Sequence, residues 1–157
     1  MNHALDNKTI VIVGGTTGLG LASAKAFVGE GARAVLVGRN ADSVSQAESA
    51  LGQAARGLTG DATDPKTTAE AIGLAKREFG GFDGLYHVAG GSGRSMGDGP
   101  LHEISDDGWR QTIDLNLTSA FNSNRAALRE FAALGQGGVI LNMTSVLPDS
   151  PAPKYFR

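Results

Sequence analysis

A glycine-rich segment near the start of the chain has the composition and spacing to hold a phosphate group. Ile10 to Val13 form a short apolar run, and the sequence Gly-Gly-Thr-Thr-Gly-Leu-Gly follows at positions 14–20, before a helical pattern. Glycine lets the chain turn sharply and lets an anion approach backbone N–H groups, and the positive end of the following helix favours negative charge. A glycine-rich turn with no ligand is the plain alternative. The flanking strand and helix favour a site for a nucleotide pyrophosphate.

Alternating apolar strands and helices must position this loop. Further strands are expected at 34–37, 58–60, 84–88 and 139–143, with helices over 19–30, over 42–55 with Gly57 as its stop, from Asp64-Pro65 to 79, and from Ser105 to about 134. Short apolar strands separated by helices predict an α/β fold, a Rossmann-type doubly wound parallel sheet of about five strands and four helices. Ligands bind such sheets at the carboxyl ends of the strands, so the loops at 14–20, 38–40, 61–62, 89–100 and 144–148 are expected on one rim.

The composition is that of one folded domain, expected over residues 1–157, and it excludes several other classes of protein. Hydrophobic residues make up 41% of the chain and charged residues 19%. The net charge of -2, without a basic cluster, argues against nucleic acid or a membrane surface as the main partner. Cysteine is absent, and His87 and His102 lack partners at metal-ligand spacing, so no metal site is assigned. The polar first residues and the shortness of every apolar run favour a cytoplasmic protein.

Motifs in the order expected for the short-chain dehydrogenase/reductase family give the chain a resemblance to that family. Val13 to Gly20 is similar to the family's TGxxxGxG loop, with Val13 where threonine is usual. Asp61-Ala62 resembles an Asp-Val pair whose carboxylate meets the adenine amino group, and His87 to Gly90 stands where the family has NNAG. With Arg39, the candidate cofactor-binding residues are Gly14, Thr16, Thr17, Gly18, Leu19, Gly20, Arg39, Asp61, Ala62, Ala89 and Gly90.

Arg39 favours NADP over NAD as the cofactor. NAD-specific sites usually carry an acidic residue after the second strand, where it accepts hydrogen bonds from the ribose 2′-hydroxyl. Here that position is Gly38, and Arg39 follows it. A guanidinium can bind a 2′-phosphate through paired charge-assisted hydrogen bonds and can stack on adenine. An exposed charge at a strand end is the alternative interpretation of Arg39.

The resemblance implies hydride transfer between a nicotinamide and the carbonyl or alcohol carbon of a small molecule. Ser145 matches the serine that hydrogen-bonds the substrate oxygen, and Asn116 matches an asparagine that distorts the long helix and holds a water of the proton relay. These two residues are the catalytic candidates. Taken alone, Ser145 is a hydroxyl at a strand end, and Asn116 is a polar residue on an amphipathic helix.

The family's general-acid tyrosine, with a lysine four residues later, is expected about a dozen residues beyond Ser145. Tyr155 has no such lysine in the sequence, and Tyr86 lies within a predicted strand. We therefore expect a cofactor-binding domain truncated at its C-terminal end and inactive alone. A non-catalytic NADP-binding or interaction module is the alternative, and an extended-type sugar-nucleotide epimerase, which usually has GxxGxxG spacing, is a weaker one. A homo-oligomer through the helix at 105–134 is a further expectation.

Overall fold

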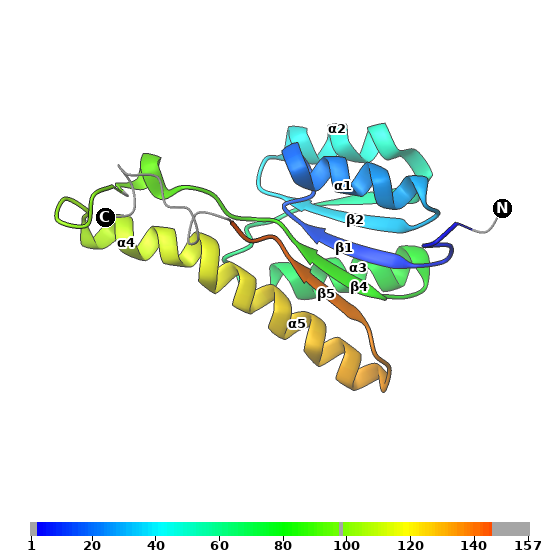
Figure 1. Cartoon of the computed structure of the whole chain (residues 1–157). Coiled ribbons are helices and arrows are strands. Elements are labelled where there is room, and N and C mark those ends of the chain that lie inside the picture. Colours follow the sequence, from blue (N-terminus) through cyan, green and yellow to red (C-terminus); the bar gives the residue numbers. More distant parts are fainter. Residues whose placement is uncertain (1–2, 98, 146–157) are drawn as a thin grey trace.

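The computed structural model describes residues 3–97 and 99–145, and it contains one parallel sheet with the strand order β3-β2-β1-β4-β5 (Figure 1). The predicted doubly wound parallel sheet is confirmed. The strands are β1 (Thr9–Val13), β2 (Arg33–Gly38), β3 (Ala55–Thr59), β4 (Gly84–His87) and β5 (Val139–Asn142). The helices are α1 (Gly18–Gly29), α2 (Ala41–Leu51), η1 (Gly52–Ala54), α3 (Thr67–Phe79), η2 (Gly93–Met96), α4 (Asp106–Ile113), η3 (Asp114–Thr118) and α5 (Ser119–Leu134).

Helices cover both faces of the sheet, with α1 and α2 on one side and α3 and α5 on the other (Figure 1). Side chains alternate between the faces along each strand. On β1, Val11 and Val13 join the core cluster under α3 and α5, whereas Ile12 joins the cluster under α1 and α2. All three are completely buried, as expected for a strand at the centre of a covered parallel sheet. This two-sided core holds the carboxyl ends of the central strands in fixed places.

The last helix is one long element with a wide turn in its middle. Ser105 begins it by accepting a hydrogen bond from the Gly108 N–H at 2.9 Å, and Gly135 ends it in a left-handed conformation with φ of 63°. The predicted bounds are therefore confirmed. Between α4 and α5, residues Asp114 to Thr118 form a π-helical turn. This is the local distortion that the resemblance implied around Asn116.

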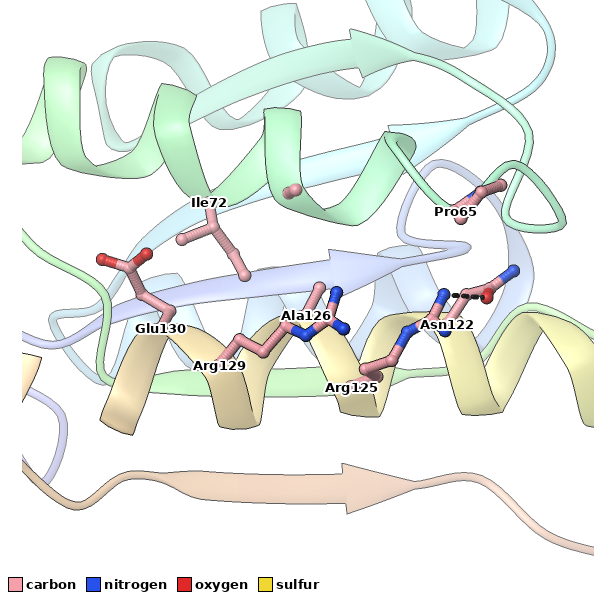
Figure 2. Close-up of a pocket in the computed structure, with 8 residues that line it drawn as sticks. Pro65, Ile72, Asn122, Arg125, Ala126, Arg129 and Glu130 are labelled. Atoms are coloured by element: carbon pink, nitrogen blue, oxygen red, sulfur yellow. Dashed lines mark hydrogen bonds between the residues drawn. The ribbon is translucent and has the colours of Figure 1, made fainter. Parts of the chain in front are cut away.

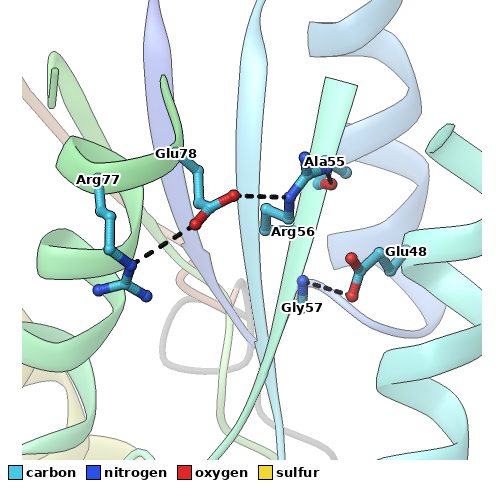
Figure 3. Close-up of polar contacts among 6 residues, drawn as sticks. All are labelled: Glu48, Ala55, Arg56, Gly57, Arg77 and Glu78. Carbon is cyan, nitrogen blue, oxygen red and sulfur yellow. Dashed lines mark hydrogen bonds and ion pairs between the residues drawn. The ribbon is translucent and has the colours of Figure 1, made fainter. Parts of the chain in front are cut away.

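Helix α2 ends earlier than the sequence predicts, so the predicted stop at Gly57 is wrong. The helix ends at Leu51 because Gly52 has a left-handed φ of 61°, and β3 begins at Ala55 rather than at Leu58. Gly57 lies inside β3, where its N–H donates to the Glu48 carboxylate at 3.0 Å (Figure 3). Two glycines five residues apart both match a helix stop, and the structure uses the earlier one.

The predicted helix start at Asp64-Pro65 is also wrong, because α3 begins at Thr67. The Asp64 carboxylate accepts a hydrogen bond from the Lys66 N–H at 2.8 Å, and its carbonyl accepts one from the Thr67 N–H at 3.2 Å. Asp64 and Pro65 thus form a turn ahead of the helix, which is a common alternative use of an aspartate before a proline.

The outer edge of the sheet at β3 is held by charged side chains from both helical layers. Arg56 of β3 donates from Nε to the Glu78 carboxylate at 3.1 Å, and Arg77 pairs with the same carboxylate at 3.5 Å (Figure 3). Partly exposed ion pairs of this kind contribute less than about 1 kcal/mol each. The Glu48 carboxylate on the Gly57 N–H also occupies a donor that an edge strand otherwise leaves open.

At the other edge, β5 is half covered. Ile140 packs against the core under α3 and α5, whereas Val139 and Leu141 are 69% and 51% exposed on the opposite face. A mainly apolar cavity of about 410 Å³ lies beside these two residues and is also lined by Phe27 and Tyr86.

Candidate functional site

One pocket of about 350 Å³ lies at the carboxyl ends of β1, β2 and β4. It includes all eleven residues that the sequence proposes for cofactor binding, which come from four separate segments of the chain. The lining residues are Val13, Gly14, Thr16, Thr17, Gly18, Leu19, Gly20, Val37, Gly38, Arg39, Gly60, Asp61, Ala62, Val88, Ala89, Gly90 and Leu115. Pockets of a few hundred Å³ at this position of a doubly wound sheet are the usual place for a nucleotide.

The glycines of the loop between β1 and α1 are required by its geometry. Gly14 has a φ of 86°, and a Cβ on it would lie 2.7 Å from the Ala89 nitrogen. A Cβ on Gly20 would overlap the Gly14 carbonyl oxygen, so this residue lets α1 pack directly on the loop. The N–H groups of Gly14 and Gly15 both donate to the Val37 carbonyl, at 2.9 and 3.1 Å, and tie the loop to β2.

The first turn of α1 presents donors to the pocket. Helices leave their first N–H groups without an intrahelical acceptor. The residue before α1, Thr17, makes no side-chain hydrogen bond to that turn, and Gly18 to Gly20 line the pocket. A Cβ on Gly18 would point into open space within the described residues. An anion therefore finds unsatisfied donors, a favourable helix dipole and no side chain in its way.

The other end of the pocket combines a cation with a carboxylate. Arg39 is exposed just after β2, and Thr16 packs its side chain against Gly38 closely enough that a Cβ there would overlap Thr16 Oγ1. Asp61 accepts hydrogen bonds on one oxygen, Oδ1, from the Thr63 N–H and hydroxyl, both at 2.8 Å. The Thr63 N–H is the main reason that the pKa of Asp61 lies below its usual value. Burial opposes this effect, whereas the Thr63 hydroxyl and the charge of Arg39 add to it. Asp61 is thus an oriented, ionised acceptor.

Asn116 connects the wide turn of the long helix to the pocket wall. Its Oδ1 accepts from the Gly91 N–H at 2.9 Å, and its Nδ2 donates to the Gly91 carbonyl at 3.0 Å and to the Thr112 carbonyl at 2.9 Å. Both amide hydrogens are used, so a water could reach the side chain only through the remaining lone pair of Oδ1. The neighbouring Leu115 lines the pocket, but Asn116 does not.

The other catalytic candidate lies at the same edge of the sheet but outside the pocket. Ser145 is exposed, three residues after β5, and does not line the pocket. Tyr86 is 6% exposed and contacts Phe27 edge to face at 5.9 Å, which confirms that it is a core residue. Tyr155 lies outside the described residues, as do residues 146–148 of the loop expected at 144–148.

Six lining residues were not among the candidates: Val13, Val37, Gly38, Gly60, Val88 and Leu115. Most of them are the last residue of a strand or directly follow one. The rule that ligands meet the carboxyl ends of parallel strands would have found these, whereas Leu115 enters through the wide turn of a distant helix.

A second and smaller cavity, of about 190 Å³, lies between α3 and α5 and shares no lining residue with the first (Figure 2). Arg125 donates to the side-chain oxygen of buried Asn122 at 3.0 Å, and its guanidinium lies over the Phe121 ring at 4.5 Å. Figure 2 shows Arg125 and Arg129 extending from α5 along this groove, with Ile72 of α3 opposite. The groove is separate from the residues that could bind a nucleotide.

Residues 3–97 and 99–145 contain neither a membrane-spanning helix nor a cluster of metal ligands. No helix there is long and apolar enough to cross a membrane. That part of the chain also contains no group of three or more His, Asp or Glu side chains arranged to bind a metal ion.

Comparison with known proteins identifies the family. A family model described as short chain dehydrogenase matches residues 8–156. The chain belongs to the short-chain dehydrogenase family. It is 32% identical over 149 residues to cis-4-hydroxycyclohexanecarboxylate dehydrogenase of Sinomonas cyclohexanicum, a match that covers 94% of the chain and 58% of that relative. It is 31% identical to an NADP-dependent (R)-specific alcohol dehydrogenase of Lentilactobacillus kefiri, covering 93% and 57% respectively.

Solved structures of short-chain dehydrogenases have the same fold. A short-chain type dehydrogenase/reductase from Mycobacterium ulcerans matches with a TM-score of 0.84 at 28% identity, over 94% of this chain and 55% of that one. The chain thus spans little more than half the length of the family members that it matches. Membership of the family relates the chain to dehydrogenases, of which the Lentilactobacillus kefiri enzyme is NADP-dependent by name.

Proposed function

We propose that the pocket binds NADP. We also propose that the chain is the cofactor-binding portion of an NADP-dependent reductase or dehydrogenase that acts on small carbonyl or alcohol compounds. The observation that carries this proposal is the convergence of eleven candidate residues on one pocket at the switch of the doubly wound sheet. The predicted single cofactor-binding domain over 1–157 and the predicted cytoplasmic location stay predictions.

The residues present fit such a cofactor along the whole pocket. The glycine loop and the first turn of α1 would hold the pyrophosphate, because they supply free N–H groups without a Cβ in the way. Asp61 keeps its Oδ2 available for the adenine amino group, since both hydrogen bonds from Thr63 go to Oδ1. Ala89 and Gly90 would contact the ribose beside the nicotinamide.

Support for NADP comes from charge. Arg39 is the cationic side chain that lines the pocket, and it directly follows β2. Gly38 stands where an NAD-specific site has an acidic residue. The Lentilactobacillus kefiri relative is NADP-dependent by name. Titration of the 157-residue chain with NADP and NAD tests the proposal, and we expect NADP to bind at least tenfold more tightly, because Arg39 adds paired charge-assisted bonds.

The nicotinamide supplies the hydride in this chemistry. We propose that Ser145 donates a hydrogen bond to the substrate oxygen and that Asn116 positions the pocket wall and a water of the proton relay. The printed sequence contains no Tyr-x-x-x-Lys, which is the pair expected to supply the proton. A module that binds NADP without catalysis is the second candidate.

We expect a polypeptide of these 157 residues to bind NADPH but to oxidise it no faster than buffer does with any carbonyl compound. The reason is that no residue of the expected tyrosine–lysine pair is available to protonate the alkoxide. Following NADPH absorbance with material of verified mass measures this. Turnover above that of a heat-inactivated sample would contradict it and favour the enzyme over the module.

We propose that the chain self-associates through the outer face of the long helix. Leu117, Phe121 and Leu128 are 63%, 56% and 59% exposed, and their spacing of four and seven residues places them on one side of the helix. We expect Phe121→Asp to weaken self-association at least about 100-fold in sedimentation velocity, because it replaces an aromatic side chain of this face with a charged one that loses water on association. Arg129→Asp, beside the α3 groove, is the control. A monomeric parent chain at high micromolar concentration would contradict the proposal.

A further inference from the structure

A buried histidine lies directly behind the wall of the pocket. His87 is the last residue of β4 and is 3% exposed, and the next three residues, Val88 to Gly90, line the pocket. Its Nδ1 lies 2.8 Å from the Ser123 hydroxyl and its Nε2 lies 3.4 Å from the Ser119 hydroxyl. Both serines come from α5 and are completely buried. The cluster joins the strand to the long helix at the site.

The hydroxyl groups of the two serines can satisfy both nitrogens of a neutral ring. The Ser119 hydroxyl donates to the Leu115 carbonyl at 2.6 Å, so it can accept a hydrogen bond from Nε2. The Ser123 hydroxyl can donate either to the Ala120 carbonyl at 3.0 Å or to Nδ1 of His87 at 2.8 Å. A ring with its proton on Nε2 satisfies both serines. A second proton on Nδ1 would make Ser123 the acceptor of that bond and direct its own proton to the Ala120 carbonyl, so the cost of a charged ring comes from its burial.

The surroundings of His87 offer no compensating charge for a protonated ring. Its partners across the sheet are Val13 on β1 and Asn142 on β5, and the side chains that contact it from α5 are the two serines. None of these four residues carries a titratable group. Burial lowers the pKa of His87 below its ordinary value of 6.5, and a hydrogen bond with the Ala89 backbone opposes this effect only in part.

The strand end that follows His87 is held to the long helix at two places. His87 is bound to α5, and four residues later Gly91 is bound to Asn116 through two hydrogen bonds, at 2.9 and 3.0 Å. Between these points, the N–H groups of Val88 and Ala89 donate to the Val13 carbonyl at 2.8 and 2.9 Å. A shift of His87 would therefore move the backbone against which Gly14 packs.

We propose that His87 is a positioning residue for the cofactor: together with Ser119 and Ser123 it fixes Val88 to Gly90 on the pocket wall, and only its neutral form allows tight binding. This inference rests on the proposed function, since it concerns the same pocket. It assigns a task to three buried residues that do not touch the cofactor themselves.

Calorimetric titration with NADPH and NADH between pH 8 and pH 5.5 tests this proposal on the 157-residue chain. We expect the affinity of the parent chain for NADH to fall over this range by less than about tenfold, because the lowered pKa of His87 leaves only part of the population protonated at pH 5.5. NADH is essential, because the 2′-phosphate of NADPH itself titrates near pH 6. His87→Asn, whose amide has no proton to gain, is expected to bind about three- to tenfold more weakly at pH 8 and to show a flat pH profile.

Two further variants keep the test decisive. Ser123→Ala retains the imidazole but removes the donor to Nδ1, so the loss of affinity should begin at a higher pH than in the parent chain. Phe82→Leu shortens a completely buried side chain of the core and should lower stability while leaving the pH profile of binding unchanged. This control separates a positioning role from a general loss of stability.

The possible results distinguish a failure of the role proposed for His87 from a failure of the proposed cofactor site. Binding by the parent chain with the same pH slope in His87→Asn and Ser123→Ala would overturn the role of His87 and leave the cofactor site standing. Absence of binding by the parent chain at every pH would overturn the proposed function and this inference with it. A flat His87→Asn profile beside a sloping parent profile supports both.

Discussion

Arg39→Ala is expected to weaken NADP binding by about 10- to 100-fold and to leave NAD binding within about twofold. Arg39 lies at the end of β2 on the pocket rim, where its guanidinium can form paired bonds to a 2′-phosphate. Hydrogen bonds between charged groups contribute about 1.5–3 kcal/mol, and each 1.4 kcal/mol corresponds to a factor of about ten. NAD lacks this phosphate, so its affinity provides the internal reference in calorimetric titrations.

The same strand provides a matched control for this prediction. Arg33 is exposed at the other end of β2, so Arg33→Ala removes the same charge without touching the pocket. It should change neither affinity by more than about twofold. Arg39→Lys keeps the charge but loses the planar fork, and should retain only part of the preference. Equal losses of NADP and NAD affinity in Arg39→Ala would show that Arg39 does not select the cofactor.

Gly20→Ala is expected to lower the free energy of unfolding by about 3 kcal/mol or more. The new Cβ would overlap the carbonyl oxygen of Gly14, which is backbone and cannot rotate away. For a chain of this size the loss corresponds to a fall in the unfolding temperature of roughly 10 °C. Thermal unfolding followed by circular dichroism measures it.

Substitutions of two other glycines of α1 separate the effect of packing from the effect on ligand binding. Gly18→Ala places its Cβ in open space inside the pocket, so we expect a loss of about 1 kcal/mol from its φ of 50° but at least tenfold weaker cofactor binding. A Cβ on Gly29 meets nothing within 4 Å, and Gly29→Ala should be neutral or raise stability by up to about 1 kcal/mol. Similar unfolding temperatures for Gly20→Ala and Gly29→Ala would refute the packing argument.

Local patterns predicted the fold well, because strands and helices here are short, regular and separated by glycine. The helix from Ser105 was placed correctly at both ends, since a capping serine and a left-handed glycine act through neighbouring residues. The boundary between α2 and β3 was not, because Gly52 and Gly57 offer the same local signal. Pairing of Gly57 with β2 and with Glu48 decides between them, and that contact is not local.

The candidate site also contains residues that the local sequence predicts and residues that it does not. The residues that line the pocket could be proposed because backbone geometry restricts their types, as Gly14 and Gly20 illustrate. His87 was noted only as a histidine without metal-ligand partners. Its serine partners lie 32 and 36 residues further along the chain, and nothing in the local pattern connects them. Buried polar clusters between distant elements need the packed structure to be seen.

The wide turn at residues 114–118 determines which side of the long helix each later residue faces. A π-helical turn accommodates one residue more than an α-helical turn, and each residue of an α-helix adds about 100° of rotation. Deleting one residue here would restore a regular helix and leave α5 in the same phase relative to α4, whereas winding all the present residues as a regular α-helix would rotate α5 by that angle. Ser119 and Ser123 would leave His87, and Asn116 would no longer oppose Gly91. The contacts of α5 with His87 therefore depend on that extra residue, and a single-residue deletion between Ser119 and Ser123, outside the turn, would show how far the pocket depends on helical phase.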